Sequence, residues 1–235
     1  MRTETRRGDA PGNRAYVRSD DPSATVLRVS VISVLPSAVA DQIAAGEVVE
    51  RPASVVKELV ENALDAGAHA IEITILDGGR ALVRVSDDGS GMDSSDAVLS
   101  LARHGTSKIH TSSDLTGVRT FGFRGEALPA ICSVARIEIE TALEDGPGTR
   151  VQAAGGEPAV VVPTQRRHGT TVSVTDLFYN SPARARFLRG ARSEWRAITE
   201  VVTTVALARR CVGFEVSEDG RRSVSAAPAT ALLVG

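Results

Sequence analysis

Aromatic residues, cysteines and long apolar runs are all scarce in this sequence. Only 3% of its 235 residues are Phe, Trp or Tyr, and its two cysteines are Cys132 and Cys211. Two cysteines cannot form a disulfide framework or a four-cysteine zinc site, so we expect both to be buried thiols in a reducing compartment. No apolar run reaches the roughly 18 residues that a transmembrane helix needs, so we expect no membrane association.

An excess of charge of one sign is also missing. The sequence has 27 basic and 29 acidic residues, which leaves a net charge of -2, and Lys57 and Lys108 are its only lysines. Bulk charge therefore does not mark the chain as a nucleic-acid binder, although it leaves room for a local basic patch. The apolar fraction of 42% is ordinary for a globular domain that buries a substantial core.

The first residues differ from the rest of the chain. Residues 1–30 are polar and mixed in charge, and they contain no apolar stretch that is followed by a small-residue cleavage site. We therefore expect a flexible N-terminal tail without a secretory signal. The apolar patterns begin at Val31, so we expect the folded domain to cover residues 31–235.

Hydrophobic periodicity predicts that helices and strands are interleaved. Helical spacing predicts helices over 37–49, 55–66, 93–103, 126–133 and 194–210. Alternation and turn residues predict strands over 71–75, 81–85, 134–142, 149–153, 158–163, 170–176, 212–217 and 222–226. We expect an interruption of the first helix near Gly46 and an N-cap at Ser54 for the second. The interleaving and the tight turns predict an α/β or α+β fold with a mixed or antiparallel sheet.

The helix predicted over 55–66 carries one polar stripe. Glu58, Glu61, Asn62 and Asp65 are spaced at i, i+3, i+4 and i+7, so they share a face. Such a stripe is usually a solvated helix surface. The alternative is a carboxylate general base, Glu58, one turn before an amide ligand, Asn62, with both side chains reaching one Mg²⁺–phosphate group.

Three other segments have residue types that suit a nucleotide. The loop 87–91 offers an acceptor carboxylate and two glycines, but it is equally an ordinary turn; as a calcium loop it lacks Glu at its twelfth position, where Val98 stands. Residues 122–128 place glycines before a helix, which suits a phosphate or a plain connector. Residues 168–172 begin a predicted strand, and this segment by itself does not indicate a function.

Longer stretches around these elements match one known family. They cover 42–52, 58–68, 105–109, 122–128 and 176–184. In order and spacing they resemble the MutL family of DNA mismatch-repair proteins, a branch of the GHKL ATPases, over residues 31 to about 210. The resemblance implies a two-layer sandwich of the GHKL type, with a mixed, mostly antiparallel sheet, helices on one face, and ATP held between helices and a lid.

The resemblance also implies roles for the matching residues. Glu58 matches the general base that activates water, and Asn62 matches the Mg²⁺ ligand. Asp87 matches an aspartate that recognises adenine. Gly89 and Gly91 match two glycines that make room for the base, and Thr171 matches a threonine that supports it. The lid and the phosphate-facing segment match Thr106, Ser107, Lys108, Gly122, Phe123, Arg124 and Gly125.

The function implied by the resemblance is ATP binding and hydrolysis in DNA mismatch repair, in the bacterial cytoplasm. ATP would gate self-association and contact with a mismatch-recognition protein of the MutS type. The family completes its site with a lysine from a second domain and dimerises through a C-terminal domain, and we expect neither domain here. The chain is then expected to bind ATP·Mg²⁺ and to hydrolyse it slowly or hardly at all. The alternative is a nucleotide-binding module without turnover.

A DNA contact is a further expectation, and it rests on an arginine-rich region. Its members are Arg166, Arg167, Arg184, Arg186, Arg189, Arg192 and Arg196. This region is either a solvated face or a non-specific, salt-dependent phosphate patch. We expect Phe178 and Tyr179 beside it to be core residues rather than stacking platforms.

Overall fold

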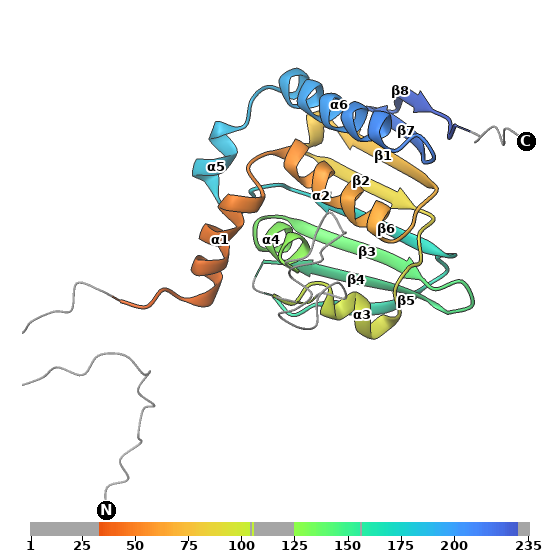
Figure 1. Ribbon diagram of the computed structural model, residues 1–235. Helices are drawn as coiled ribbons and strands as arrows, with labels where there is room; N and C mark the ends of the chain where they lie inside the picture. Colours follow the sequence, from red (N-terminus) through yellow and green to blue (C-terminus); the bar gives the residue numbers. More distant parts are fainter. Residues whose placement is uncertain (1–32, 104, 106–124, 156, 230–235) are drawn as a thin grey trace, which may run out of the picture. The chain divides into compact units, whose positions relative to one another are not determined.

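The computed structural model describes residues 33–103, 105, 125–155 and 157–229 (Figure 1). The chain divides into two compact units, 1–36 and 37–235. The predicted tail, residues 1–30, lies outside the described residues. The second unit holds every helix and strand described below. None of the described helices is both long and apolar enough to cross a membrane.

The centre of the second unit is an eight-stranded sheet with the order β5-β4-β3-β6-β2-β1-β7-β8. Its strands are β1 Ala70–Leu76, β2 Leu82–Asp87, β3 Arg136–Ala142, β4 Gly148–Ala154, β5 Val160–Thr164, β6 Gly169–Thr175, β7 Gly213–Glu218 and β8 Arg221–Ala226. Neighbouring strands are antiparallel except for β1 and β7, which are parallel. The mixed, mostly antiparallel sheet is confirmed.

Helices cover one face of this sheet, so the predicted two-layer arrangement is also confirmed (Figure 1). They are α1 Ser37–Val48, α2 Pro52–Asp65, α3 Ser94–Leu99, α4 Ala127–Val134, α5 Pro182–Phe187 and α6 Ala191–Ala208, and a short 3-10 turn, η1 Asp77–Gly79, joins β1 to β2. The core lies between the layers because each element presents apolar residues at its own period. Ile71, Ile73 and Ile75 alternate along β1, while Val56 and Val60 follow the helical period of α2, and all five are buried.

The opposite face of the sheet is polar. Arg84 donates from Nε to Ser173 Oγ at 3.0 Å, and the Arg150 guanidinium pairs with Glu140 at 2.7 Å. These cross-strand pairs use the side chains that point away from the helices. The two faces of the sheet therefore have different chemistry, one apolar and one hydrogen-bonded.

Several local expectations were wrong. α1 runs through Gly46 without interruption, and a side chain there would meet nothing within 4 Å. α2 begins at Pro52, with Arg51 rather than Ser54 as its N-cap, because proline has no N–H to satisfy in a first helical turn. α3 is shorter than 93–103, and Asp93 caps it by accepting from the Asp96 N–H at 2.8 Å.

Two side-chain predictions were also wrong. Cys211 is exposed rather than buried, while Cys132 is half-buried, and burial raises the pKa of its thiol to about 11. Tyr179 is 40% exposed, and the Arg136 guanidinium lies 4.7 Å from the centre of its ring. Phe178 is buried in the core, as expected.

An ion pair fixes the start of α2 against α6. The carboxylate of Glu194 is 1% exposed and accepts from Arg51 Nε at 2.9 Å and from the Arg189 N–H at 3.0 Å. A buried carboxylate needs such partners because losing water is costly for a charge. This pair therefore helps to set the position of α2, which carries the polar stripe.

We predict that Glu194→Gln lowers the free energy of unfolding by about 1.5–3 kcal/mol, because hydrogen bonds to a charged group are lost inside the protein. Urea unfolding measures the change. Glu215→Gln is the control: Glu215 pairs with Arg222 at 2.6 Å on the surface, and exposed pairs contribute roughly 0–1 kcal/mol. Equal losses in the two variants would contradict a structural role for the buried pair.

Candidate active site

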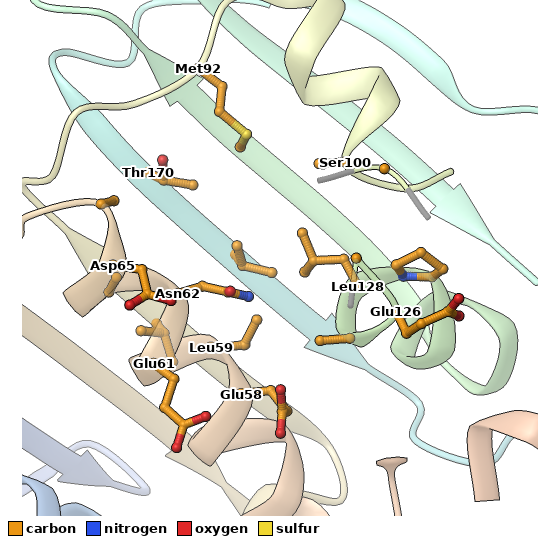
Figure 2. A pocket seen from close by; sticks show the side chains of 18 of the residues that line it. Glu58, Leu59, Glu61, Asn62, Asp65, Met92, Ser100, Glu126, Leu128 and Thr170 are labelled. Carbon is orange, nitrogen blue, oxygen red and sulfur yellow. The ribbon is translucent and has the colours of Figure 1, made fainter. Parts of the chain in front are cut away.

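A cavity of about 1010 Å³ opens between α2, α4, the loop after β2 and the helix-facing side of β2 and β6. Its size lies at the upper end of typical ligand pockets. Polar side chains reach it from α2, β2, β6 and the start of α4, and Figure 2 shows several of them around one space. Polar groups that converge on one concave space are typical of a ligand site.

All four members of the polar stripe on α2 line this cavity. Glu58 and Asn62 both line it, and Figure 2 shows the amide of Asn62 reaching into the space beside Leu59. Lys57 Nζ lies 3.0 Å from the Glu61 carboxylate and 3.5 Å from the Glu58 carboxylate. The helix thus brings carboxylates and an amide to the cavity wall, with one lysine beside two of the carboxylates.

Asp87 is the last residue of β2, and its side chain faces the cavity together with Val85. It is 9% exposed, and its Oδ1 accepts from the Gly89 N–H at 2.9 Å. Burial raises the pKa of this carboxyl, although the N–H groups of Gly89 and Thr170 and the charge of Arg166 act against the rise. A buried, partly satisfied carboxylate in a cavity wall is a typical recognition group.

The predicted glycines have different places. Gly91 and Gly125 line the cavity, whereas Gly89 does not and instead packs against Ala66. Gly91 has a φ of +69°, and a Cβ there would overlap the carbonyl oxygen of Ala142. Glycine is therefore required for the loop to lie so close to the end of β3.

Thr171, the threonine expected to support the base, does not line the cavity, whereas its neighbour Thr170 does. The structure places Thr170 in the cavity wall (Figure 2), while Thr171 lies on the opposite face of the sheet, where its Oγ1 is 2.9 Å from Ser86 Oγ. Successive side chains of a strand point to opposite faces, so only one of two adjacent threonines can face the cavity. The geometry thus favours Thr170 over the predicted Thr171.

Thr141 on β3 is a site residue that the sequence reasoning missed. Its side chain is fully buried, and its Oγ1 accepts from the Met92 N–H at 2.9 Å and lies 3.0 Å from Thr170 Oγ1. It therefore joins the loop after β2 to the cavity threonine. A single threonine within an alternating strand carries no motif, so only its strand register could have indicated it.

Some predicted positions cannot be placed. They belong to the predicted lid and phosphate-facing segment and lie outside the described residues: Thr106, Ser107, Lys108, Gly122, Phe123 and Arg124.

The predicted arginine patch is divided among several elements. Arg166 and Arg167 belong to the β5–β6 turn, and the rest belong to α5, α6 and the segment between them. Arg184 donates to the carbonyl of Val49 and lies over the ring of Phe178 at 4.2 Å, so it stabilises the fold. The exposed members near α5 and α6 are Arg186, Arg189, Arg192 and Arg196.

The donor set suits a hard metal ion only together with a ligand. Within the described ranges, no group of three or more His, Cys, Asp or Glu side chains is arranged to hold a metal. Mg²⁺ usually takes one or two protein oxygens and completes its shell with phosphate and water. The side chains of Asn62 and Glu58 can supply oxygens of that kind, so the cavity fits a magnesium–phosphate group rather than a bare ion.

The class of protein follows from this fold and site. The family model described as histidine kinase-, DNA gyrase B- and HSP90-like ATPase matches residues 50–152, which include α2, β2 and the loop after β2. The MutL ATPase domain of Aquifex aeolicus, solved in complex with ADP, has a TM-score of 0.60 and 30% identity, and the match covers 78% of this chain and 66% of that one. The chain contains an ATPase domain of the GHKL class.

Within that class, the chain belongs to the MutL family of DNA mismatch-repair proteins. MutL of Gemmatimonas aurantiaca is 63% identical over 193 residues, which are 82% of this chain and 32% of that protein. MutL of Anaeromyxobacter dehalogenans is 57% identical over 191 residues, or 81% of this chain and 31% of that protein. The chain spans about a third of the length of these relatives.

We predict opposite stability changes for two neighbouring aspartates. The raised pKa of Asp87 means that its bound proton stabilises the fold below 3.8, its ordinary value, and that this contribution is lost as the pH rises through the folded pKa. At pH 7 the buried charge is unfavourable, so Asp87→Asn should increase the free energy of unfolding, with no difference at the lowest pH.

Asp88 is the matched control, because its pKa is shifted in the opposite direction. Burial acts to raise the pKa of its carboxyl, but the N–H groups of Ala70 and His69 outweigh it and lower the pKa. Its contribution is present above 3.8 and is lost as the pH falls through the lowered folded pKa. Asp88→Asn should therefore destabilise the protein at pH 7. Urea unfolding between pH 3 and pH 7 measures both, and changes of the same sign would contradict these assignments.

Proposed function

We propose that the cavity binds ATP·Mg²⁺ and that the chain, over residues 31–235, is the GHKL ATPase domain of a MutL-type mismatch-repair protein. One observation carries the proposal: Glu58 and Asn62 on α2 and Asp87 and Thr170 on the sheet line the same cavity of about 1010 Å³. The ADP bound by the Aquifex aeolicus neighbour supports it.

The adenine end of the proposed site is the end of β2. The Asp87 carboxylate can accept from the exocyclic amine of the base, because an ionised carboxylate offers only acceptors. The Thr170 hydroxyl, 3.0 Å from Thr141 Oγ1, supplies a second polar contact. Because Gly91 has no side chain, the loop lies close to the end of β3, and the flat ring of the base can approach its backbone.

The phosphate end is formed by α2 and the start of α4. Asn62 would hold Mg²⁺, which when bound supplies charge neutralisation for the phosphate oxygens. Glu58 accepts a proton from the water whose oxygen attacks the terminal phosphorus, and the bond from phosphorus to the bridging oxygen breaks. Gly125 and the first residues of α4 line the cavity, and the N-terminal end of a helix suits a phosphate.

The role of the whole protein is part of the same proposal. We propose that nucleotide binding controls self-association and contact with a mismatch-recognition protein of the MutS type, in the bacterial cytoplasm. Non-specific contact with DNA would use Arg186, Arg189, Arg192 and Arg196, which are exposed around α5 and the start of α6. The identities to the MutL relatives support these assignments.

We predict that the chain binds a non-hydrolysable ATP analogue with Mg²⁺ and that Asp87→Asn weakens this binding by about 10- to 100-fold, the value of a hydrogen bond to a charged group. Titration calorimetry measures the affinities. Glu72→Gln, on an exposed position of β1, is the control and should bind like the parent. A folded chain without binding would refute the proposed function, and normal binding by Asp87→Asn would refute the adenine end.

We predict that Glu58→Gln keeps nucleotide affinity within about 2-fold but lowers the rate of hydrolysis by roughly 10²–10⁴-fold, because a general base contributes about that much. Single-turnover assays with radiolabelled ATP detect the slow turnover expected of the chain. Glu72→Gln, on an exposed position of β1 that does not line the cavity, is the control and should keep the parental rate. A Glu58→Gln rate equal to the parent's would favour a nucleotide-binding module whose turnover does not use this carboxylate.

A further inference from the structure

We infer that Arg166 is a positioning residue for recognition of the nucleobase: from the far face of the sheet it holds the backbone of Asp87 and so aims that carboxylate into the cavity. The inference rests on the proposed nucleotide site and extends it to a residue that never touches the nucleotide.

The contacts of Arg166 converge on the end of β2. Its Nη2 donates to the backbone carbonyl of Asp87 at 2.8 Å, and its Nη1 donates to Ser86 Oγ at 3.4 Å. Ser86 Oγ lies 2.9 Å from Thr171 Oγ1. One guanidinium thus bridges two consecutive residues of β2 and, through a hydroxyl, reaches β6. A planar fork with several donors suits this geometry better than the single ammonium of lysine.

Alternation along the strand places Arg166 and the nucleotide on opposite sides of Asp87. The Asp87 side chain faces the helices, whereas Ser86 and Thr171 face the other side. On that side Arg166 lines a second cavity, of about 530 Å³, together with His168. Any effect of Arg166 on nucleotide binding must therefore pass through the backbone or the charge of Asp87.

The backbone of Asp87 lies at the last pairing of β2, opposite Ile71 of β1 and Thr170 of β6. The β2–β6 register runs from Leu82 and Thr175 to Asp87 and Thr170, and no further pair follows. Gly169, with a φ of +101°, lets the β5–β6 turn approach, since a Cβ there would overlap the Asp87 carbonyl oxygen. Arg166 therefore fixes the last residue of the strand, where a small rotation would swing the carboxylate away from the base.

Charge provides a second route from Arg166 to the same carboxyl. The guanidinium lowers the pKa of Asp87 and partly offsets its burial, while neighbouring Asp88 acts in the opposite direction. Asp65 shares the first cavity wall from α2, and the second cavity is lined by Glu72, Arg167, His168 and Glu215. The pKa of Glu140 on β3 is lowered by its hydrogen bond from Arg150 and also by the charge of Arg166. Without the guanidinium, Asp87 would take up a proton at a higher pH and stop acting as a pure acceptor.

Base selectivity is the property that this positioning would control. A correctly aimed carboxylate accepts from the amine of adenine but meets a carbonyl acceptor in guanine, and two facing acceptors repel. If the carboxylate turns aside, adenine loses its partner and the repulsion of the guanine carbonyl is relieved. If the carboxylate takes up a proton, its O–H can also donate to that carbonyl. The ratio of the two affinities should therefore fall.

The test measures binding of non-hydrolysable ATP and GTP analogues, with Mg²⁺, between pH 5 and pH 8. Arg166→Met should weaken ATP-analogue binding by about 2- to 10-fold, the value of a hydrogen bond, with GTP-analogue binding unchanged or stronger. The pH at which ATP-analogue binding falls by half should shift upwards. Arg166→Lys keeps the charge, so it should restore the pH midpoint but not the full affinity ratio.

Arg84→Met is the matched control, because Arg84 also donates to a hydroxyl, Ser173 Oγ, on the same face. It should leave both the ratio and the midpoint unchanged. An Arg166→Met protein with the parental ratio and midpoint overturns the inference, as does an equal loss for both analogues that accompanies a lower melting temperature. If Arg166→Met does not fold, Ser86→Ala and Arg166→Lys apply the same criteria to the ratio.

The outcomes also separate this inference from the proposed function. A parent chain that binds neither analogue refutes the nucleotide site and the positioning role together. In another outcome the parent chain binds the ATP analogue, Asp87→Asn loses this binding, and Arg166→Met binds like the parent. This result supports the nucleotide site and refutes only the role of Arg166.

Discussion

The pairing of Asp87 with Thr170 across β2 and β6 determines what each face of the sheet can do. Because side chains alternate along both strands, this one register sends Asp87 and Thr170 to the helix side and Ser86 and Thr171 to the polar side. A slip of one residue would exchange the two sets and remove the carboxylate from the cavity. The apolar residues of the same strands hold the register, since Val83, Val85 and Val174 must stay in the core.

The Asp87 carboxylate lies in the cavity wall, where its ionisation does not stabilise the fold. Burial raises the pKa of Asp87, so the folded protein favours its neutral form more than water does. Hydrogen bonds from the Gly89 and Thr170 backbones and the charge of Arg166 reduce that preference without removing it. A recognition group that opposes folding is a common compromise at binding sites, where a ligand supplies the missing partner.

Sequence reasoning reached most of the architecture because periodicity and turn residues are strong local signals. Within the described part of the chain it placed the eight strands and five of the six helices, and it missed α5, Pro182–Phe187, which has no buried residue and hence no apolar pattern. It misjudged Gly46, since a glycine interrupts a helix only where the surroundings favour another conformation. For the candidate site, spacing put the polar residues of α2 on one face, and the resemblance to the MutL family selected Glu58 and Asn62 among them. Thr170 could not be separated from Thr171 without the register, which is a long-range property.

The residues that sequence reasoning could not reach share a physical cause. Thr141 and Arg166 act through contacts with residues far away in the sequence, at Met92 and Asp87, and neither belongs to a motif of its own. A sequence motif contains the residues that contact the ligand. The residues that position these groups lie on neighbouring strands or turns, which are distant in the sequence. The sheet therefore joins its two faces at Asp87: the helix side presents the carboxylate, and the polar side determines how firmly that carboxylate is held. Variation in the β5–β6 turn would then alter nucleobase recognition while every residue that faces the nucleotide stays the same.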